Sequence, residues 1–248
     1  MESKGAMRYV SSAGIVLVSE KDSIAIDCFC KDPGKQYPDT PPEVRGELLQ
    51  EIGVGKLNSL IFTHEHGDHF CPEDVKEAWK RNPNIQIYAG DKVTEILSRT
   101  GISQSNLIKI KAPERRTLGN FQIDFLDSLH EGEQYADVAN LTLLIKIEEK
   151  RVVVTGDAAP CEALFQRIAT WSGEIDWLFA PFPYVGLRSN RRMLEKYLDI
   201  ANIFVLHQPR KEADVQNWVD SAKRVCENAK DKLPGPIFPE ALGEWYVL

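Results

Sequence analysis

The feature that most constrains this chain is a histidine-rich segment, Thr63-His64-Glu65-His66-Gly67-Asp68-His69. It follows directly after an apolar run, residues 57–63, which predicts a short β-strand. In extended chain, residues two positions apart point the same way, so His64 and His66 can reach one metal ion together. Gly67 permits a turn that sends Asp68 and His69 toward a second point nearby. Imidazole and carboxylate ligands suit zinc, and also manganese or iron.

Three more residues able to bind metal also follow predicted strands. His130 comes after residues 121–126, and His207 comes after residues 203–206. Asp157 follows the strand 151–155 and Gly156. Strand ends on one edge of a layered sheet converge in space, so we expect these side chains to close around the histidine-rich segment.

In this order the residues resemble the pattern of the metallo-β-lactamase superfamily. That pattern is an acid ending an early strand, His-x-His-x-Asp-His, a distant His, an Asp after a strand and a glycine, and a final His. Its elements here are Asp27, residues 64–69, His130, Asp157 and His207. The resemblance spans nearly the whole chain. It implies a binuclear metallohydrolase in which two divalent ions, zinc by default and otherwise manganese or iron, activate a water without a nucleophilic Ser or Cys.

The resemblance also implies a role for each residue. The first ion is expected on His64, His66 and His130, and the second on Asp68, His69 and His207. Asp157 bridges the two ions, and Asp68 is in addition a candidate proton acceptor. Asp27 is expected to support the histidine-rich segment through hydrogen bonds rather than to bind metal.

The remaining sequence predicts an α/β (α+β) chain in which clustered strands alternate with helices. Strands are expected at residues 13–18, 23–27, 57–63, 85–88, 107–110, 121–126, 140–147, 151–155, 177–180, 203–206 and 244–247. Helices are expected at residues 43–52, 92–99, 161–171, 190–200 and 213–229, with another beginning at Pro72. This order favours a four-layer αββα sandwich of two mixed β-sheets flanked by helices, the metallo-β-lactamase fold, in a single domain over residues 1–248.

Composition limits the kinds of partner that we expect the chain to bind. The formal net charge of −7 argues against a general nucleic-acid binder. No stretch approaches the ~20 apolar residues of a membrane span, and the first residues do not resemble a secretory signal, so we expect a cytoplasmic protein with reduced cysteines. Cys28, Cys30, Cys71 and Cys161 are interpreted as packing or helix-capping residues rather than ligands. Homo-oligomerisation stays open.

Arg188, Arg191 and Arg192 flank a predicted helix start, where cations are disfavoured. They predict either a clamp for a phosphate or carboxylate or a solvated face with an Arg191–Glu195 pair. Tyr184 is expected either to line the substrate pocket or to pack within its loop.

Within the superfamily, the sequence looks most like compact cytosolic members such as the ascorbate-6-phosphate lactonase-like proteins. His66 stands where the diiron flavoprotein-type members usually carry Glu. We therefore expect a hydrolase of a small, anionic substrate with a lactone, ester or phosphodiester bond. The alternatives are a nuclease or cyclic-nucleotide phosphodiesterase, and a non-catalytic metal-binding protein with the same fold.

Overall fold

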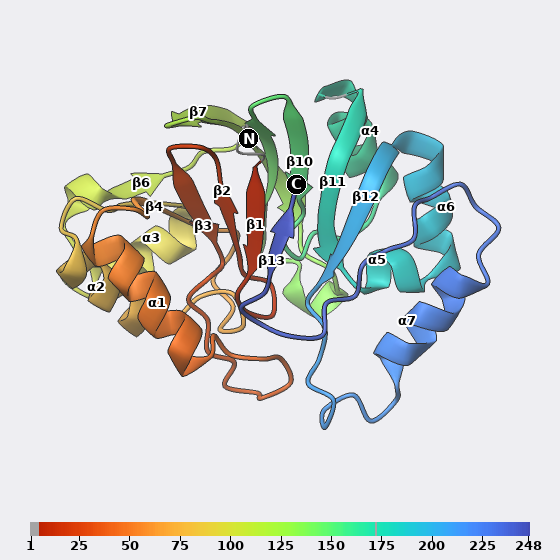
Figure 1. The fold of residues 1–248 in the computed structure, drawn as a ribbon, viewed down its shortest axis with the longest axis horizontal. Coiled ribbons are helices and arrows are strands. Elements are labelled where there is room, and N and C mark those ends of the chain that lie inside the picture. Colours follow the sequence, from red (N-terminus) through yellow and green to blue (C-terminus); the bar gives the residue numbers. More distant parts are fainter. Residues whose placement is uncertain (1–4, 172) are drawn as a thin grey trace.

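A computed structural model of the chain describes residues 5–171 and 173–248 and arranges their strands in two sheets (Figure 1). The first sheet has the order β13-β1-β2-β3-β4-β5-β6. Its strands are Ala6–Tyr9 (β1), Ile15–Val18 (β2), Ser23–Ile26 (β3), Ser59–Phe62 (β4), Gln86–Ala89 (β5), Leu107–Lys109 (β6) and Trp245–Val247 (β13). The sheet is mixed, because β13, β1, β2 and β3 pair antiparallel whereas β3 to β6 pair parallel.

The second sheet has the order β12-β11-β10-β9-β8-β7. Its strands are Glu114–Leu118 (β7), Phe121–Leu129 (β8), Ala139–Ile147 (β9), Lys150–Val154 (β10), Glu174–Pro181 (β11) and Asp199–Leu206 (β12). Strands β7 to β10 are antiparallel, and β10 to β12 are parallel. Both sheets are therefore mixed, as the sequence predicts.

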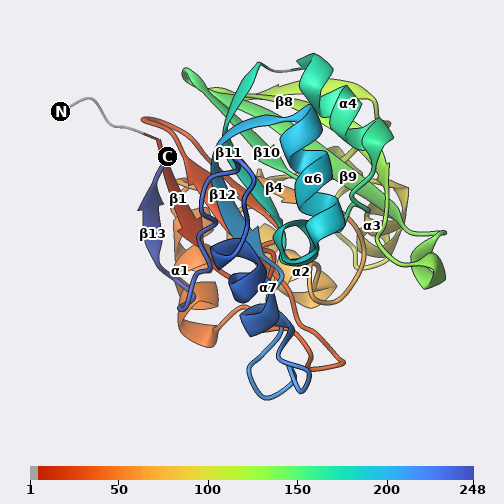
Figure 2. The same cartoon turned by 90° about the vertical axis from the view of Figure 1, so that its right-hand side faces the viewer.

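The helices lie outside the two sheets (Figures 1 and 2). The α-helices are Pro42–Gly53 (α1), Pro72–Arg81 (α2), Asp91–Ser98 (α3), Glu162–Trp171 (α4), Pro183–Gly186 (α5), Arg188–Tyr197 (α6) and Trp218–Glu227 (α7). Two 3-10 turns span Gln104–Asn106 and Glu133–Tyr135. Helices α1 to α3 flank the first sheet, and α4 to α7 flank the second.

Three separate apolar cores hold these layers together. In β2, Ile15 and Leu17 point into a core shared with Phe121, Phe125 and other residues of the second sheet. Val16, between them, points the other way, into a core shared with the helices of the first sheet. This alternation follows from the two-residue period of a strand. A third core joins the second sheet to its own helices. The order of the layers is thus helix, sheet, sheet, helix, which confirms the predicted αββα sandwich.

Some element boundaries differ from the sequence-based expectation. Strands β1 and β7 and the short helix α5 were not predicted. The helix predicted for residues 190–200 ends at Tyr197, because Asp199–Leu206 instead pairs along the whole of β11. The helix predicted from residue 213 begins at Trp218, because Asn217 adopts a left-handed φ of 54° and the Asp214 carboxylate accepts the N–H groups of Trp218 and Val219.

The topology places the carboxyl ends of six strands on one edge of the sandwich. Strands β3 and β4 are parallel, and so are β10, β11 and β12, while β8 runs in the direction of β10 because both are antiparallel to β9. The two sheets meet at this edge, where the N–H of Leu141 donates to Thr63 O over 3.0 Å and the N–H of His207 donates to Ser12 O over 2.8 Å. Segments that follow these strands therefore gather in one place.

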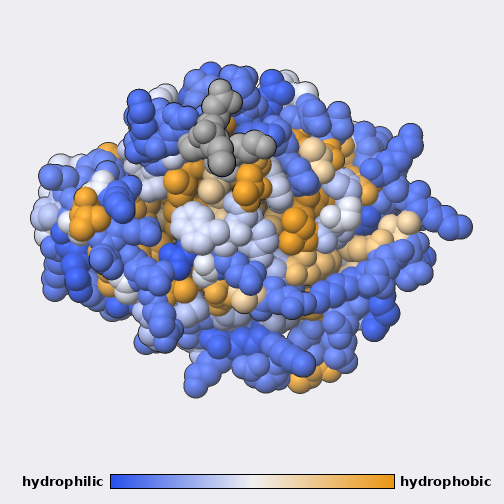
Figure 3. Space-filling model, viewed as in Figure 1, coloured by the Kyte–Doolittle hydropathy of each residue, from blue (hydrophilic) through white to orange (hydrophobic). Residues whose placement is uncertain are grey.

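Hydrophilic residues cover most of the face drawn in Figure 3, and hydrophobic residues emerge there only in small patches. Among the described residues, no helix is both long enough and apolar enough to span a membrane.

Candidate metal centre

Seven histidine and aspartate side chains come together at the shared edge in two groups. The first group is His64, His66 and His130, and the second is Asp68, His69, Asp157 and His207. Within each group, one potential ligand atom of every residue lies within 4.8 Å of those of the others. The structure brings together the seven residues expected as ligands, with Asp157, which was expected between the two ions, in the second group. Each group takes residues from both sheets.

Asp27 organises the histidine-rich segment from the end of β3. Its carboxylate accepts hydrogen bonds from the N–H of Thr63 (2.9 Å), from Thr63 Oγ1 (2.6 Å) and from His69 Nδ1 (2.8 Å). Asp27 has a φ of 51°, in the left-handed region that non-glycine residues rarely adopt. The strained backbone turns the carboxylate toward the loop after β4, so Asp27 occupies the supporting position that the resemblance implies.

Hydrogen bonds on the outer side of three imidazoles fix which nitrogen faces the centre. His64 Nδ1 donates to Thr63 Oγ1 over 3.0 Å, and His69 Nδ1 donates to Asp27. His130 Nδ1 donates to the carbonyl oxygen of Glu131 over 2.7 Å. Each ring therefore carries a proton on Nδ1 and presents Nε2 to the centre, which is the arrangement of metal-binding histidines.

Gly67 allows the histidine-rich segment to pass close to the loop after β3. A Cβ on Gly67 would lie 2.7 Å from Pro33 Cδ and 2.8 Å from the carbonyl oxygen of Lys31. The same two segments are joined by a hydrogen bond from the N–H of Lys31 to Gly67 O, 2.7 Å long. A side chain at position 67 would push this contact apart, so the glycine is required by close packing.

The ligands from the second sheet are also fixed by their surroundings. Asp157 follows Gly156, whose φ is 54°, and its N–H donates to Asn140 Oδ1 over 3.1 Å. His207 has a φ of 57°, and its Nε2 lies 2.8 Å from Asp68 Oδ2 and 3.2 Å from Asp157 Oδ2. The left-handed backbone of His207 is thus used to direct its ring at the two carboxylates.

Four buried polar atoms at the centre form no hydrogen bond within the described part of the chain: His64 Nε2, His69 Nε2, His130 Nε2 and Asp157 Oδ1. His69 Nε2 lies 3.2 Å from Asp157 Oδ1, and His130 Nε2 lies 3.6 Å from Asp157 Oδ2, as ion pairs. Burying a polar atom without a partner costs on the order of 1–3 kcal/mol, and this cost applies most fully to His64 Nε2. They come from both groups. The donor set and these atoms without hydrogen bonds fit divalent metal ions.

Electrostatics in the metal-free chain prepare the centre for cations. Burial lowers the pKa of His64 well below its usual value, and His69 lowers it further, so the imidazole is neutral. Burial opposes ionisation of Asp157, but His207 and His69 outweigh it and hold the pKa of that carboxyl well below its usual range. At Asp68 the burial effect is likewise outweighed, chiefly by the hydrogen bond from His207, and the pKa falls to about 2. Both carboxylates are thus ionised.

The centre opens into a cleft of about 590 Å³. Its floor includes His66, Asp68, Asp157 and His207, and its walls come from the loop after β3, residues 131–135, residues 181–184 and the start of α7. In Figures 1 and 2 the loop after β3 and the chain before α7 both lie at the lower edge of the molecule. A volume of this size suits a small-molecule ligand.

The predicted substrate residues have other surroundings. Arg191 is buried, and its guanidinium donates to both carboxylate oxygens of Asp231 (2.7 and 2.6 Å) and to Cys226 Sγ, so it neither pairs with Glu195 nor lines the cleft. Arg188 is exposed at the first residue of α6, outside the cleft walls. Tyr184 does lie in the wall, but its hydroxyl is donated to Ala158 O over 2.7 Å.

Besides Phe182, three aromatic residues of the cleft were not predicted. Tyr37 packs on His207 with ring centroids 3.9 Å apart, and Tyr135 packs on both His66 (4.8 Å) and His130 (4.9 Å). Trp218 stands at the mouth, 41% exposed. The sequence held a partial signal for Tyr37, which lies in the Pro- and Gly-rich loop after β3, and for Tyr135, which lies five residues after His130. It held none for Trp218.

Two mixed sheets between helices, with a His- and Asp-rich centre at the strand ends, define the metallo-β-lactamase fold class. A family model described as the beta-lactamase superfamily domain matches residues 24–214. The chain therefore belongs to the β-lactamase superfamily. No curated protein matches its sequence.

Solved structures share this fold at low sequence identity. A metallo hydrolase from the hyperthermophilic archaeon Ignicoccus hospitalis is 16% identical, with 99% of each chain covered and a TM-score of 0.69. An isothiocyanate hydrolase from Delia radicum gut bacteria is 17% identical, with 98% of each chain covered and a TM-score of 0.69. CmlA, a diiron β-hydroxylase from Streptomyces venezuelae, is 14% identical, with a TM-score of 0.66; the match covers all of this chain (100%) and 54% of that chain.

Proposed function

We propose that the chain is a metal-dependent hydrolase with a binuclear centre. The observation that carries this proposal is the convergence of seven His and Asp side chains, with buried donor atoms that form no hydrogen bonds, on the floor of a cleft. His64, His66 and His130 would hold one ion, and Asp68, His69 and His207 the other, with Asp157 between them. Zinc suits this ligand set best, and manganese or iron are the alternatives.

Divalent ions held there would supply Lewis-acid polarisation of the substrate and lower the pKa of a water. The chain's own contribution is orientation: Thr63, Asp27 and the carbonyl of Glu131 hold the imidazoles with Nε2 inward. Asp68 lines the cleft and lies 2.8 Å from His207 Nε2, and it is the candidate proton acceptor. Tyr37 and Tyr135 pack on the rings of His207 and His66 and help to hold them in place.

We place a lactone or ester ahead of a phosphodiester as the bond that is broken. Phosphate groups are usually met by Arg or Lys, and no such side chain lines the cleft within the described residues. The same absence removes the support for the anionic substrate expected from Arg188 and Arg191. Nuclease and cyclic-nucleotide phosphodiesterase activities rank lower for the same reason.

Metal reconstitution combined with an activity panel tests the proposal. The metal-free chain would be loaded separately with zinc, manganese or iron, its metal content measured by mass spectrometry, and hydrolysis followed for lactones, carboxylic esters and bis(p-nitrophenyl) phosphate. We expect about two ions per chain, ester or lactone turnover, and loss of turnover on chelation. A fully loaded chain that is inert across the panel would instead favour a non-catalytic metal-binding protein.

A further inference from the structure

We infer that the substrate of the proposed hydrolase carries an uncharged, aromatic-sized apolar group, which the cleft walls recognise beside the reacting bond. This inference rests on the proposed function and adds the substrate class to it.

Aromatic side chains form the walls nearest the metal groups. Tyr37 lies against His207 and Tyr135 against His66 and His130, so both rings are in contact with candidate ligands. Phe182, Tyr184 and Trp218 line the same cleft farther along. A substrate whose reacting bond reaches the centre therefore lies beside aromatic rings, which contact flat apolar groups favourably.

The charges around the cleft disfavour an anionic group at this position. Apart from the candidate ligands, the charged side chains that line it within the described residues are Asp32 and Glu131, both acidic. Asp32 is fixed in place, because its carboxylate accepts the N–H groups of Gly34 and Tyr37, each over 2.8 Å. Acidic side chains beside the cleft therefore act against binding of an anionic group.

The arginine that contacts the cleft-forming loop is already engaged elsewhere. Arg210 donates from Nε to the carbonyl oxygen of Tyr37 over 2.8 Å, and its guanidinium lies 3.3 Å from the Asp39 carboxylate. It holds the loop after β3 near His207 and does not line the cleft. Together with the Arg191–Asp231 pair, this leaves the aromatic walls without a cation to bind a substrate carboxylate or phosphate.

Two matched esters test the inference on the zinc-loaded chain. They are 2-phenylethyl acetate and 2-(4-carboxyphenyl)ethyl acetate, which differ only at the ring position remote from the reacting bond. We expect kcat/KM to be at least about ten-fold higher for the neutral ester. Equal values, or a preference for the carboxylated ester, would overturn the inference while leaving the hydrolase proposal intact.

Binding of a non-reacting probe separates the two proposals. Ligand-observed NMR would measure the Kd of 2-phenylethanol and of 4-(2-hydroxyethyl)benzoate, with and without zinc. We expect the neutral probe to bind more tightly in both states, because the walls do not depend on the metal. If no ester is hydrolysed but this preference is observed, the function proposal fails and the inference stands; absence of any preference contradicts the inference.

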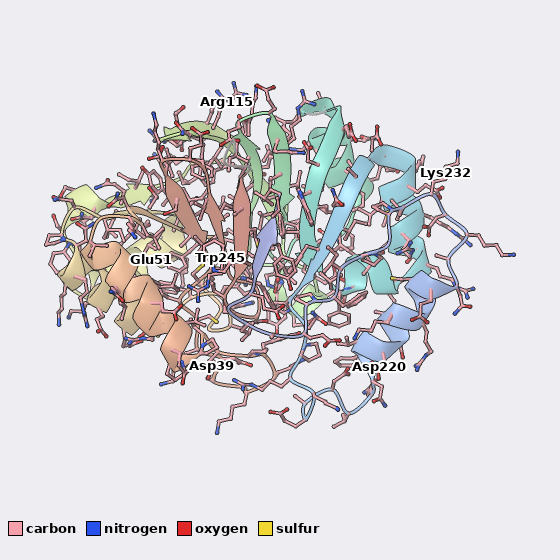
Figure 4. The ribbon with its side chains drawn as sticks, in the orientation of Figure 1. Asp39, Glu51, Arg115, Asp220, Lys232 and Trp245 are labelled. Carbon is pink, nitrogen blue, oxygen red and sulfur yellow. The ribbon has the colours of Figure 1, made fainter. Side chains whose placement is uncertain are left out.

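Substitutions test which residues of the cleft recognise the apolar group. Trp218→Ala should weaken binding of 2-phenylethanol about ten-fold, whereas Trp245→Ala, which removes an exposed ring on β13 outside the cleft walls (Figure 4), should leave it unchanged. Gln134→Arg places a cation in the cleft wall and should shift the ester preference toward the carboxylated substrate, and Gln134→Glu should shift it the other way. Equal effects of Trp218→Ala and Trp245→Ala, or no shift with Gln134→Arg, would contradict the assignment.

Discussion

His69 Nδ1 donates a hydrogen bond to Asp27 Oδ2 over 2.8 Å, with both side chains almost completely buried. The same carboxylate also receives the N–H and the hydroxyl of Thr63. One acid at the end of β3 therefore sets both the backbone and a ring of the segment that follows β4.

Replacing Asp27 by Ala should lower metal affinity about 10- to 100-fold without removing a ligand, because His69 loses the acceptor that orients it. Asp27→Asn keeps an acceptor oxygen and should lose less metal affinity than Asp27→Ala. Competition with a zinc chelator of known affinity measures the effect. Unchanged affinity in Asp27→Ala would contradict the supporting role.

Removing a candidate ligand should have a larger effect. His66→Ala takes one member from the first group and Asp157→Ala one from the second, and we expect each to lower bound metal and to reduce turnover by more than about 100-fold, beyond the range for supporting residues. Metal per chain and kcat/KM are measured together. Full activity in either variant would refute the assignment.

Gly67→Ala should destabilise the chain by about 1–3 kcal/mol, because the added methyl group meets Pro33 and the Lys31 carbonyl. Gly46→Ala is the matched control: a Cβ there has no atom within 4 Å, and the exposed position inside α1 should gain up to about 1 kcal/mol. Urea unfolding of both variants measures this. If Gly67→Ala also stabilises, the close-packing argument is wrong.

The buried Arg191–Asp231 pair predicts a pH effect far from the metal groups. The hydrogen bond from Arg191 lowers the pKa of Asp231 below its unfolded value of about 4. A depressed folded pKa gives stability that is present above the unfolded pKa and is lost as pH falls through the folded pKa.

Asp231→Asn should therefore lower the free energy of unfolding by about 3 kcal/mol at pH 7. The difference in this free energy between the variant and the unmodified chain should become smaller below about pH 4. Glu95→Gln, which breaks the exposed pair with Arg99, serves as the control and should change stability by less than about 0.5 kcal/mol. Urea titrations of the metal-free proteins at several pH values compare the two. A difference that stays constant through this range would mean that Asp231 does not act through its charge.

The sequence predicted the fold and the residues that come together at the centre because both rest on local patterns. Apolar runs mark the buried strands, and polar residues directly after them mark their ends. It could not predict the partner of Arg191, because Asp231 lies forty positions away and the pair forms only when α6 packs against the chain after α7. It also missed the start of α7, where the side chain of Asp214 replaces helical hydrogen bonds.

The residues that line the cleft walls were harder to predict from the sequence. Tyr37, Tyr135 and Trp218 sit in irregular segments without periodicity, and their nearness to the ligands depends on how separate loops meet. The expectation of an anionic substrate found no support, because it relied on arginines that flank a predicted helix start, and packing directs the side chain of Arg191 to Asp231 instead.

Each ligand group spans the seam between the two sheets, since the first joins the loop after β4 to the end of β8 and the second joins it to the ends of β10 and β12. An ion bound at either group would link the two sheets, and its binding free energy would add to the stability of the folded chain. A chain without bound metal should then unfold more readily where the two sheets meet, and proteases should digest it sooner. The supply of metal would therefore set the lifetime of each molecule.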